Sequence, residues 1–522
     1  MHKTVIISYT KMVRIGFASL ELADIEKVIL GEKVEIPAET RSRVEESFNF
    51  LKEFSRNKII YGINTGFGPM AQYQIEASEQ IQLQYNLIRS HASGSSNYLS
   101  KPYVKASMLA RLNTLSLGYS GIHTSALEVL AALINHDVTP LIFEHGGVGA
   151  SGDLVQLAHL ALVMIGEGEV EYQGHVRPTQ EVFAELGIAP MKISLREGLG
   201  VMNGTSVMTG IGLVNSIFAS RAIEWSIMAT TMICEMVDAY DDYFSRELNQ
   251  SKKHRGQQEV ARLIKQNLDE SRYIRKREQQ LYTKLSDEKV LLDKVQEYYS
   301  IRCVPQIAGA ILETVQQCQK LLVEEANSAN DNPIVDVKSR NVLHGGNFHG
   351  DYVSFEMDKL KIAITKLSML AERQLNFLMN PKLNGILPPF VNLGKLGFNF
   401  GMQGIQFTAT STTAENQMLS NPMYVHSIPN NNDNQDIVSM GTNAALCAKK
   451  VIENTYEVLA IELVTIVQAL DYLQKTEGLS AQSRHAYSSI RSIVPTFVED
   501  YPVYRDMAKV KQYLMENSPF AT

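Results

Sequence analysis

Residues 452–473 read IENTYEVLAIELVTIVQALDYL, and the spacing of their apolar side chains predicts a long helix with one buried face. Apolar residues recur at alternating steps of four and three, at Ile452, Tyr456, Leu459, Leu463, Ile466, Leu470 and Leu473. Such steps line one side of a helix for about six turns. The segment from Asp351 to about Met379 repeats this pattern. Helices of this length need partner faces, so we expect a mainly α protein built on a bundle of long antiparallel helices.

Composition and charge restrict the class of protein further. The 522 residues are 45% hydrophobic and 20% charged, with a net charge of -7, which excludes a disordered or fibrous chain and gives no general affinity for nucleic acid or anionic membranes. The N-terminal apolar run, Val5–Ile7, is too short for a signal peptide. The most apolar longer window, Val207–Met232, contains polar and charged residues and is expected to be a buried helix. The cysteines are scattered without CxxC spacing, so a reduced, cytoplasmic setting fits best; they are Cys234, Cys303, Cys318 and Cys447.

The organisation of the chain indicates a single unit of residues 1–522. No internal repeat and no linker rich in Pro, Gly or Ser divides it. Within this unit we expect an N-terminal region of about residues 1–205, followed by the central helical bundle and C-terminal helices of about residues 206–522. Loops rich in Gly and Asn interrupt both parts, and we expect them to contribute to a shared polar site.

The most informative loop is HGGVGASGD at residues 145–153. Its Gly147-x-Gly149-x-x-Gly152 spacing satisfies the dinucleotide-binding pattern, with a strand-like segment before it and a helical one after it. The rest of the chain, however, lacks the alternating strands and helices of a doubly wound sheet. The Gly-x-Ser-x-Gly elbow of serine hydrolases is also not met, because the second glycine comes one residue early. Asp153 alone would suit the dipole at the start of the following helix.

A third interpretation of this loop uses chemistry that only small residues permit. In Ala150-Ser151-Gly152 the amide nitrogen of Gly152 can reach the carbonyl carbon of Ala150 if the loop makes a tight turn, which glycine tolerates. Ring closure with loss of water, and dehydration of Ser151, would give an imidazolone that carries a methylidene group. The product is a strong electrophile made from backbone, without an external cofactor.

This loop, GGVGASGDLVQLAHLAL, resembles the self-processing motif of the aromatic amino acid ammonia-lyase and aminomutase family, which includes histidine, phenylalanine and tyrosine ammonia-lyases. The resemblance continues through motifs along almost the whole chain: YGINTGFG (61–68), LIRSHASG (87–94), MNGTS (202–206), VQEYYSIRCVPQ (295–306), NSANDNPI (327–334), GGNFHG (345–350), TTAENQ (412–417) and NNDNQDIVSMG (431–441). It implies the ammonia-lyase (fumarase/aspartase-like) type of long-helix bundle, with a smaller N-terminal region that bears a methylidene-imidazolone (MIO) formed from Ala150, Ser151 and Gly152. It also implies a homotetramer whose active sites combine loops of more than one subunit.

The resemblance assigns roles to further residues by their positions in these motifs. Tyr61 matches the catalytic tyrosine, in a loop that includes Gly68. Arg302 matches the arginine that holds the substrate carboxylate, for which a planar guanidinium is suited. Asn203 and Tyr299 match positions around the prosthetic ring, where donors could stabilise negative charge.

The remaining matches concern the shell of the active site. Gln296, Asn332 and Phe348 fall on positions of this shell. Glu415 is assigned to proton handling or to binding of the substrate amine. A metal site is not expected, because the five-residue spacing of His344 and His349 does not place both on one helix face.

The substrate is indicated by two positions that disagree. The pair Ser90-His91 resembles the selectivity pair of histidine lyases, whereas Gln435 stands where those enzymes have a glutamate and where tyrosine and phenylalanine enzymes have glutamine. A carboxylate can hold a charged imidazole, which a neutral amide cannot, while His91 can still bind a phenol hydroxyl. Together with the surrounding motifs, which look like bacterial tyrosine ammonia-lyases, this favours conversion of L-tyrosine to trans-p-coumarate and ammonia.

Three alternatives stay open at this point. The chain could be a histidine ammonia-lyase that forms urocanate. It could be a tyrosine 2,3-aminomutase, which uses the same site but returns the ammonia to the β-carbon. It could also be a helical scaffold protein with a dead site, although the triad together with Tyr61 and Arg302 argues against that.

Overall fold

The computed structural model describes residues 12–282, 289–291 and 294–520. The N-terminal apolar run discussed above, Val5–Ile7, lies outside the described residues. The chain divides into two compact units, each made of three segments. Unit 1 comprises residues 1–215, 318–358 and 422–446, and unit 2 comprises residues 216–317, 359–421 and 447–522. Residues 12–205 therefore all lie in unit 1, together with two later segments.

The described residues are mostly helical, which confirms the predicted fold class. The helices that lie wholly in unit 1 are α1 Leu22–Ile29, α2 Ala38–Phe54, α3 Gln80–His91, α4 Lys101–Ser116, α5 Ser125–Asn135, α6 Leu154–Met164, α7 Thr179–Leu186 and α8 Glu197–Met202. Those of unit 2 are α10 Arg246–Gln250, α11 Arg255–Leu268, α12 Arg277–Gln280, α13 Tyr299–Arg302, α16 Pro381–Asn384, α17 Gln403–Leu419, α19 Ala481–Ile493 and α20 Tyr504–Glu516. Four long helices contribute residues to both units: α9 Ser206–Met236, α14 Val304–Ala326, α15 Asp351–Met379 and α18 Gly441–Leu473. Single 3₁₀ turns occur at Ser55–Asn57, Gly68–Met70, Asp241–Phe244 and Pro389–Val391.

The helix predicted over residues 452–473 is the C-terminal part of α18. Six of its seven spaced apolar residues are buried, and Leu473 at the helix end is half-buried. The helix buries more than the predicted face, because Ile461 and Val464 between those positions are also 0% exposed. Tyr456 is buried with its hydroxyl donating to the carbonyl oxygen of Phe218 at 2.7 Å, so its polar atom is satisfied inside unit 2.

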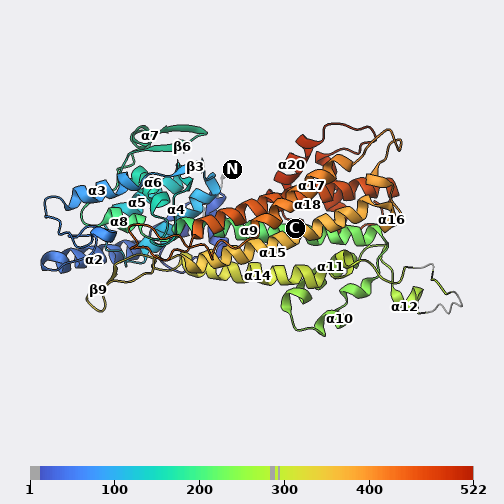
Figure 1. Ribbon diagram of the computed structural model, residues 1–522, viewed down its shortest axis with the longest axis horizontal. Coiled ribbons are helices and arrows are strands. Elements are labelled where there is room, and N and C mark those ends of the chain that lie inside the picture. Colours follow the sequence, from blue (N-terminus) through green and yellow to red (C-terminus); the bar gives the residue numbers. More distant parts are fainter. Residues whose placement is uncertain (1–11, 283–288, 292–293, 521–522) are drawn as a thin grey trace, which may run out of the picture. The chain divides into compact units, whose positions relative to one another are not determined.

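The strands are short and form only small sheets among the described residues. β1 Val13–Arg14 pairs in parallel with β2 Val34–Glu35. The other pairs are antiparallel: β3 Ser95–Tyr98 with β5 Phe143–His145, β8 Ile334–Asp336 with β9 Asn341–Leu343, and the sheet of β4 Thr139–Pro140, β6 Glu169–Tyr172 and β7 His175–Pro178. Figure 1 shows α7 beside the β6–β7 hairpin. The doubly wound sheet that the glycine spacing alone would suggest is thus not present in the part of the chain described.

Helix α9 is apolar and long enough to be compared with a membrane span. In its most apolar window 78% of the residues are buried inside the protein. Its burial agrees with the expectation of a core helix at residues 207–232.

Candidate active site

The loop that contains Ala150-Ser151-Gly152 runs from β5 to the start of α6 and makes a sharp turn. Gly152 has a φ of +69°, in the region that side chains disfavour. A Cβ atom at this position would collide with the carbonyl oxygen of Gly204. That oxygen accepts a hydrogen bond from the amide of Asp153 at 2.8 Å, so the chain after Ser151 is held against the segment after α8. Only glycine fits this close approach.

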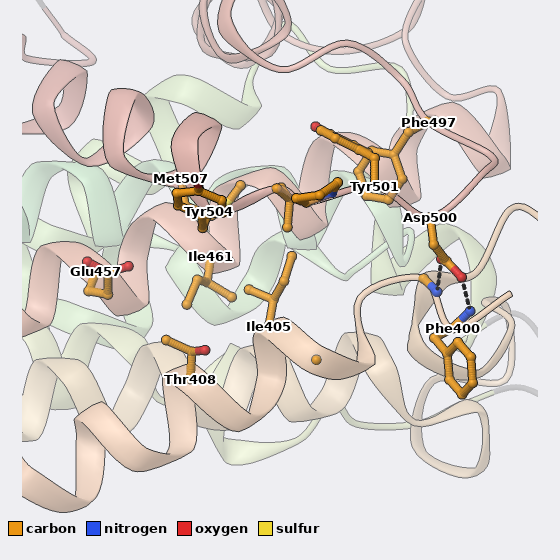
Figure 2. A pocket seen from close by; sticks show the side chains of 14 residues that line it. Phe400, Ile405, Thr408, Glu457, Ile461, Phe497, Asp500, Tyr501, Tyr504 and Met507 are labelled. Atoms are coloured by element: carbon orange, nitrogen blue, oxygen red, sulfur yellow. Dashed lines mark hydrogen bonds between the residues drawn. The ribbon is translucent and has the colours of Figure 1, made fainter.

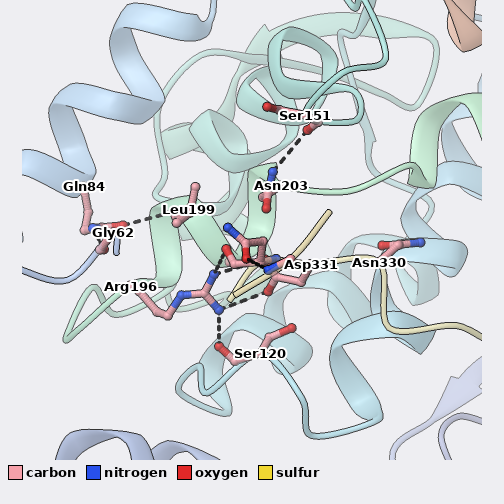
Figure 3. Close-up of polar contacts among 12 residues, drawn as sticks. Gly62, Gln84, Ser120, Ser151, Arg196, Leu199, Asn203, Asn330 and Asp331 are labelled. Carbon is pink, nitrogen blue, oxygen red and sulfur yellow. Dashed lines mark hydrogen bonds and ion pairs between the residues drawn. The ribbon is translucent and has the colours of Figure 1, made fainter. Parts of the chain in front are cut away.

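Ser151 receives polar groups from two distant segments of unit 1. The Asn203 side-chain amide donates to the Ser151 carbonyl oxygen at 3.2 Å (Figure 3). The Gln435 side-chain amide donates to the Ser151 hydroxyl oxygen at 2.8 Å. The structure therefore brings together three of the residues predicted from the sequence. A small-residue turn with donors at both Ser151 oxygens fits the proposed cyclisation into an MIO group.

Asp153 has a different role from the one its position suggested. It precedes α6, but its carboxylate makes no cap there. One carboxylate oxygen accepts the amides of Val207 and Met208, in the first turn of α9, at 2.8 and 2.9 Å, and the other accepts the Thr442 hydroxyl at 2.5 Å. Burial raises the pKa of Asp153 to about 6, although these three hydrogen bonds act in the opposite direction. Asp153 thus joins the triad loop to the start of α9.

The Tyr61 loop is anchored by apolar residues on both sides of the tyrosine. Ile60 and Ile63 are 3% and 2% exposed and belong to a buried cluster with Leu51, Val335 and Val342. Tyr61 itself is half-buried. This packing fixes the backbone of the loop while the tyrosine ring stays accessible.

The hydroxyl of Tyr61 has a backbone partner within its own loop. The amide of Gly68 donates to the Tyr61 hydroxyl oxygen at 3.1 Å. Gly68 has a φ of +53°, and a Cβ atom there would approach the Asn431 side-chain nitrogen to 2.7 Å. The Tyr61 loop and the loop that carries Gln435 are therefore neighbours.

The segment before Gln435 is a left-handed turn. Asn431, Asn432 and Asp433 have φ values of 55°, 50° and 58°, and Asn and Asp are among the residues that tolerate this region. Two backbone hydrogen bonds between Asn430 and Gln435, at 3.2 and 3.3 Å, close the turn. The closed turn directs the Gln435 amide to Ser151.

Ser90 and His91 lie in the last turn of α3. The His91 Nδ1 atom lies 3.0 Å from the Leu87 carbonyl oxygen and 3.0 Å from the Ser90 hydroxyl oxygen. Burial disfavours the charged ring, so the pKa of His91 is lowered, while the Leu87 carbonyl opposes this. A neutral ring whose Nδ1–H donates to Leu87 leaves Nε2 as an acceptor.

Asn332 follows a fully buried ion pair. The Arg196 guanidinium contacts the Asp331 carboxylate at 3.0 and 3.1 Å and donates to the Asn332 carbonyl oxygen at 2.8 Å (Figure 3). Both charged side chains are 0% exposed. The Asn332 side-chain oxygen accepts the amide of Gly345 at 2.8 Å. The ion pair therefore holds the backbone at Asn332, which in turn holds the start of the 345–350 segment.

Phe348 is half-buried in this segment, which also reaches the triad loop. The amide of Gly350 donates to the Gly149 carbonyl oxygen at 3.0 Å, and the Ser439 hydroxyl donates to the same oxygen at 3.0 Å. Phe348 is thus attached to a segment that contacts the loop of Ser151.

The other predicted site residues belong to unit 2. Arg302 and Tyr299 are on α13, where the guanidinium lies 4.7 Å from the centre of the Tyr299 ring and its Nε donates to the Glu297 carbonyl oxygen at 2.9 Å. Gln296 and Tyr299 line a cavity of about 750 Å³, and Tyr299 is 70% exposed. Three of the predicted residues therefore lie within one short stretch.

Glu415 lies on the exposed side of α17. Its carboxylate accepts the Asn454 amide at 2.6 Å and lies 3.7 Å from the Lys450 ammonium. These partners give the side chain a local structural role, and the assignment to proton handling stays a prediction.

Unit 2 also contains an apolar pocket of about 440 Å³ that includes none of the predicted residues (Figure 2). Phe497, Tyr501 and Ile461 contribute to its lining. The Asp500 carboxylate at its edge already accepts the backbone amide of Phe400 at 2.8 Å. The geometry gives no reason to place the chemistry in this pocket. Among the described residues no three His, Cys, Asp or Glu side chains are arranged as a metal site.

Sequence reasoning did not find Asp153 in its present role or the Arg196–Asp331 pair. It also missed Gln84, whose buried side chain bonds to the backbone of Gly62 and Leu199. Asp331 lies in the NSANDNPI motif (327–334), so this motif could have identified it as a candidate. The partners of Gln84 and Arg196 are far away in the sequence, and no local pattern identifies them.

A turn of small residues, donors at Ser151 and a tyrosine loop next to the Gln435 loop are the features that the sequence motifs led us to expect. Residues 20–492 match the model of the aromatic amino acid lyases. A tyrosine 2,3-aminomutase of Myxococcus sp. (strain Mx-B0) is 37% identical over 507 residues, which cover 95% of this chain and 96% of that protein. A histidine ammonia-lyase of Natranaerobius thermophilus is 35% identical over 507 residues, 97% of each chain. The crystal structure of a tyrosine aminomutase from Streptomyces globisporus superposes with a TM-score of 0.93 at 34% identity, covering 97% of both chains. The chain belongs to the aromatic amino acid ammonia-lyase and aminomutase family.

Proposed function

We propose that the protein removes ammonia from L-tyrosine to give trans-p-coumarate, as a cytoplasmic homotetramer with an MIO group formed from Ala150, Ser151 and Gly152. The observation that carries the proposal is the pair of donors at Ser151, from Asn203 and Gln435. Closure of the ring joins the Gly152 nitrogen to the Ala150 carbonyl carbon and releases one water. Loss of the Ser151 hydroxyl and its α-hydrogen releases a second.

The residues assigned to the reaction then have separate tasks. An MIO group formed here would supply an electron-poor carbon able to bind the substrate amine. Asn203 donates to the Ser151 carbonyl oxygen and so stabilises negative charge at that atom. Tyr61 takes the β-proton, and the Gly68 amide that donates to its hydroxyl oxygen supports negative charge there. Arg302 binds the substrate carboxylate, with its guanidinium oriented by the Glu297 carbonyl.

The preference for tyrosine rests on His91 and Gln435. With Nδ1–H donating to Leu87, His91 offers Nε2 as an acceptor for a phenol hydroxyl. Phenylalanine has no hydroxyl to offer, so it would leave this acceptor without the substrate as a partner. Gln435 carries no charge to hold a protonated imidazole, which disfavours histidine.

Two alternatives within the family are supported by specific observations. The names of the Myxococcus and Streptomyces proteins favour a tyrosine 2,3-aminomutase, in which ammonia returns to the β-carbon. The Ser90-His91 pair and the Natranaerobius protein favour a histidine ammonia-lyase. The same active-site residues would serve all three reactions.

A substrate panel distinguishes these activities. Purified protein is incubated separately with L-tyrosine, L-histidine and L-phenylalanine, and the products are separated by chromatography. We expect trans-p-coumarate as the main product; urocanate or β-tyrosine as the main product would overturn the tyrosine lyase assignment. Ser151→Ala should abolish turnover, whereas Ser492→Ala, at an exposed serine of α19, should not change it.

A further inference from the structure

Gln84 is a fully buried amide between the Tyr61 loop and α8. We propose that it is a positioning residue that sets the distance between Tyr61 and Ser151. The inference rests on the proposed elimination chemistry. It concerns how the residues of that site are positioned and not which bond is broken.

Both polar atoms of the Gln84 side chain are used. Its nitrogen donates to the Gly62 carbonyl oxygen at 3.0 Å, and its oxygen accepts the Leu199 amide at 3.0 Å (Figure 3). The side chain is 0% exposed, so neither bond competes with water. Gly62 directly follows Tyr61, and Leu199 lies in the first turn of α8. One amide therefore connects the tyrosine loop to the helix that precedes Asn203.

The connection continues from α8 to the triad. The amide of Asn203 donates to the Leu199 carbonyl oxygen at 2.9 Å, and the Asn203 side chain donates to the Ser151 carbonyl oxygen at 3.2 Å. A continuous series of hydrogen bonds thus connects Gly62 to Ser151. All of its members lie in unit 1.

The backbones along this route approach one another closely. Gly62 has a φ of +76°, and a Cβ atom there would collide with the Leu199 side chain. A Cβ atom at Gly198 would approach the backbone carbonyl oxygen of Gln84 to 2.9 Å. The glycines therefore allow the contact, and the Gln84 amide fixes its register.

Only a side chain with one donor and one acceptor at this length satisfies both backbone groups. An ionised glutamate can accept from Leu199 but repels the Gly62 carbonyl. A protonated glutamate has an O–H donor and a C=O acceptor in almost the same places. The function of Gln84→Glu should therefore depend on pH in a way that the wild type does not.

The test compares Gln84→Glu with two variants. Gln82→Glu is the matched control, because Gln82 is exposed on the same helix and bonds only to Asn86, at 2.9 Å. Gln84→Met keeps the volume and removes both hydrogen bonds. For each protein kcat and KM are measured with L-tyrosine from pH 6 to 9. Mass spectrometry gives the mass of the proteolytic peptide that contains residues 150–152. Hydrogen exchange of residues 61–68 is followed in parallel.

At alkaline pH we expect kcat of Gln84→Glu to fall about tenfold to a hundredfold, with KM changed by less than about threefold. The ratio of its kcat to that of the wild type should rise as the pH falls, since a buried carboxyl takes up a proton above its usual pKa of about 4.3. Gln84→Met should lose kcat to a similar extent without this recovery. Residues 61–68 should exchange faster in both variants, while the peptide still lacks two water molecules.

Each contrary outcome has a defined meaning. If Gln84→Glu and Gln84→Met behave like Gln82→Glu in kcat and in hydrogen exchange, the positioning role is refuted. Loss of the mass change in Gln84→Met would also refute it, because the amide would then act on ring formation. If the wild type itself lacks the mass change, the proposed function fails instead. Should Gln84→Glu not fold, Gln84→Met and its exchange pattern decide the matter.

Discussion

Replacing Asp331 by asparagine should destabilise unit 1 strongly, because it removes one partner of a fully buried ion pair. The Arg196 guanidinium would keep its bonds to the carbonyl oxygens of Ser120, at 2.5 Å, and Asn332, at 2.8 Å. Its charge would lose the carboxylate that pairs with it, and the new amide NH₂ would face one of its N–H groups. Breaking a buried pair in this way costs about 3–5 kcal/mol.

The matched control is Glu185→Gln, which breaks an exposed pair in the same unit. Arg177 lies 2.7 Å from Glu185, with the side chains 31% and 45% exposed. Exposed pairs contribute about 0–1 kcal/mol, because water screens them and two long side chains are immobilised. The decrease in unfolding free energy should therefore be at least about threefold larger for Asp331→Asn than for the control.

Unfolding followed by circular dichroism at one protein concentration measures the two changes. Hydrogen exchange then locates the effect, which should be greatest in residues 194–205 and 328–335. Equal midpoints for Asp331→Asn and Glu185→Gln would contradict the reasoning. So would accelerated exchange that avoids both segments.

Three further predictions concern other buried groups. Asp153 holds its proton more tightly in the folded protein, with a pKa of about 6, than in the unfolded chain. The stability that this gives is complete below about pH 4 and is lost as the pH rises through 6. In unfolding titrations, the unfolding free energy of Asp153→Asn relative to the wild type should therefore rise by up to about 3 kcal/mol between pH 4 and 7. Gly149→Ala should lower the melting temperature much more than Gly187→Ala, because both glycines have positive φ but only at Gly149 would a Cβ collide with Ser439. Tyr456→Phe should cost about 0.5–1.5 kcal/mol in chemical denaturation, since it removes the hydrogen bond from the buried hydroxyl while the Phe218 carbonyl oxygen keeps its donor within α9.

The sequence was sufficient where local pattern determines structure. The apolar steps of residues 452–473 predicted α18, and the run of small residues at 146–152 predicted a turn that only glycine permits. Both depend on neighbouring residues, so they can be recognised without knowing the rest of the fold. The prediction that only one face is buried was incomplete, because Ile461 and Val464 are also buried. Their burial depends on the packing of unit 2 and not on the sequence of the helix.

The members of the candidate site were assigned from motifs, but their contacts could not be predicted from the sequence. Ser151, Asn203 and Gln435 were each assigned by motif, yet the hydrogen bond from Gln435 to Ser151 joins residues 284 positions apart. Arg196 and Asp331 are 135 positions apart, and a charged residue in a sequence does not indicate whether it will be buried with a partner. Burial and pairing of polar groups are decided by tertiary structure, which is why these residues were missed.

Three buried polar residues of unit 1 have in common that each binds a group from a distant segment of the chain. Gln84, Asp153 and Asp331 are each at most 1% exposed, and each binds a backbone amide or a guanidinium from a distant segment. Tyr61 and His91, which are assigned to the reaction, are only half-buried. A residue that must meet a substrate cannot be held by dense packing around its own side chain, so its position has to be fixed through the backbone next to it. Buried amides and carboxylates do this because their hydrogen bonds are directional, whereas apolar contacts allow small shifts. The residues that touch no substrate should therefore control catalytic geometry as strongly as many of those that do.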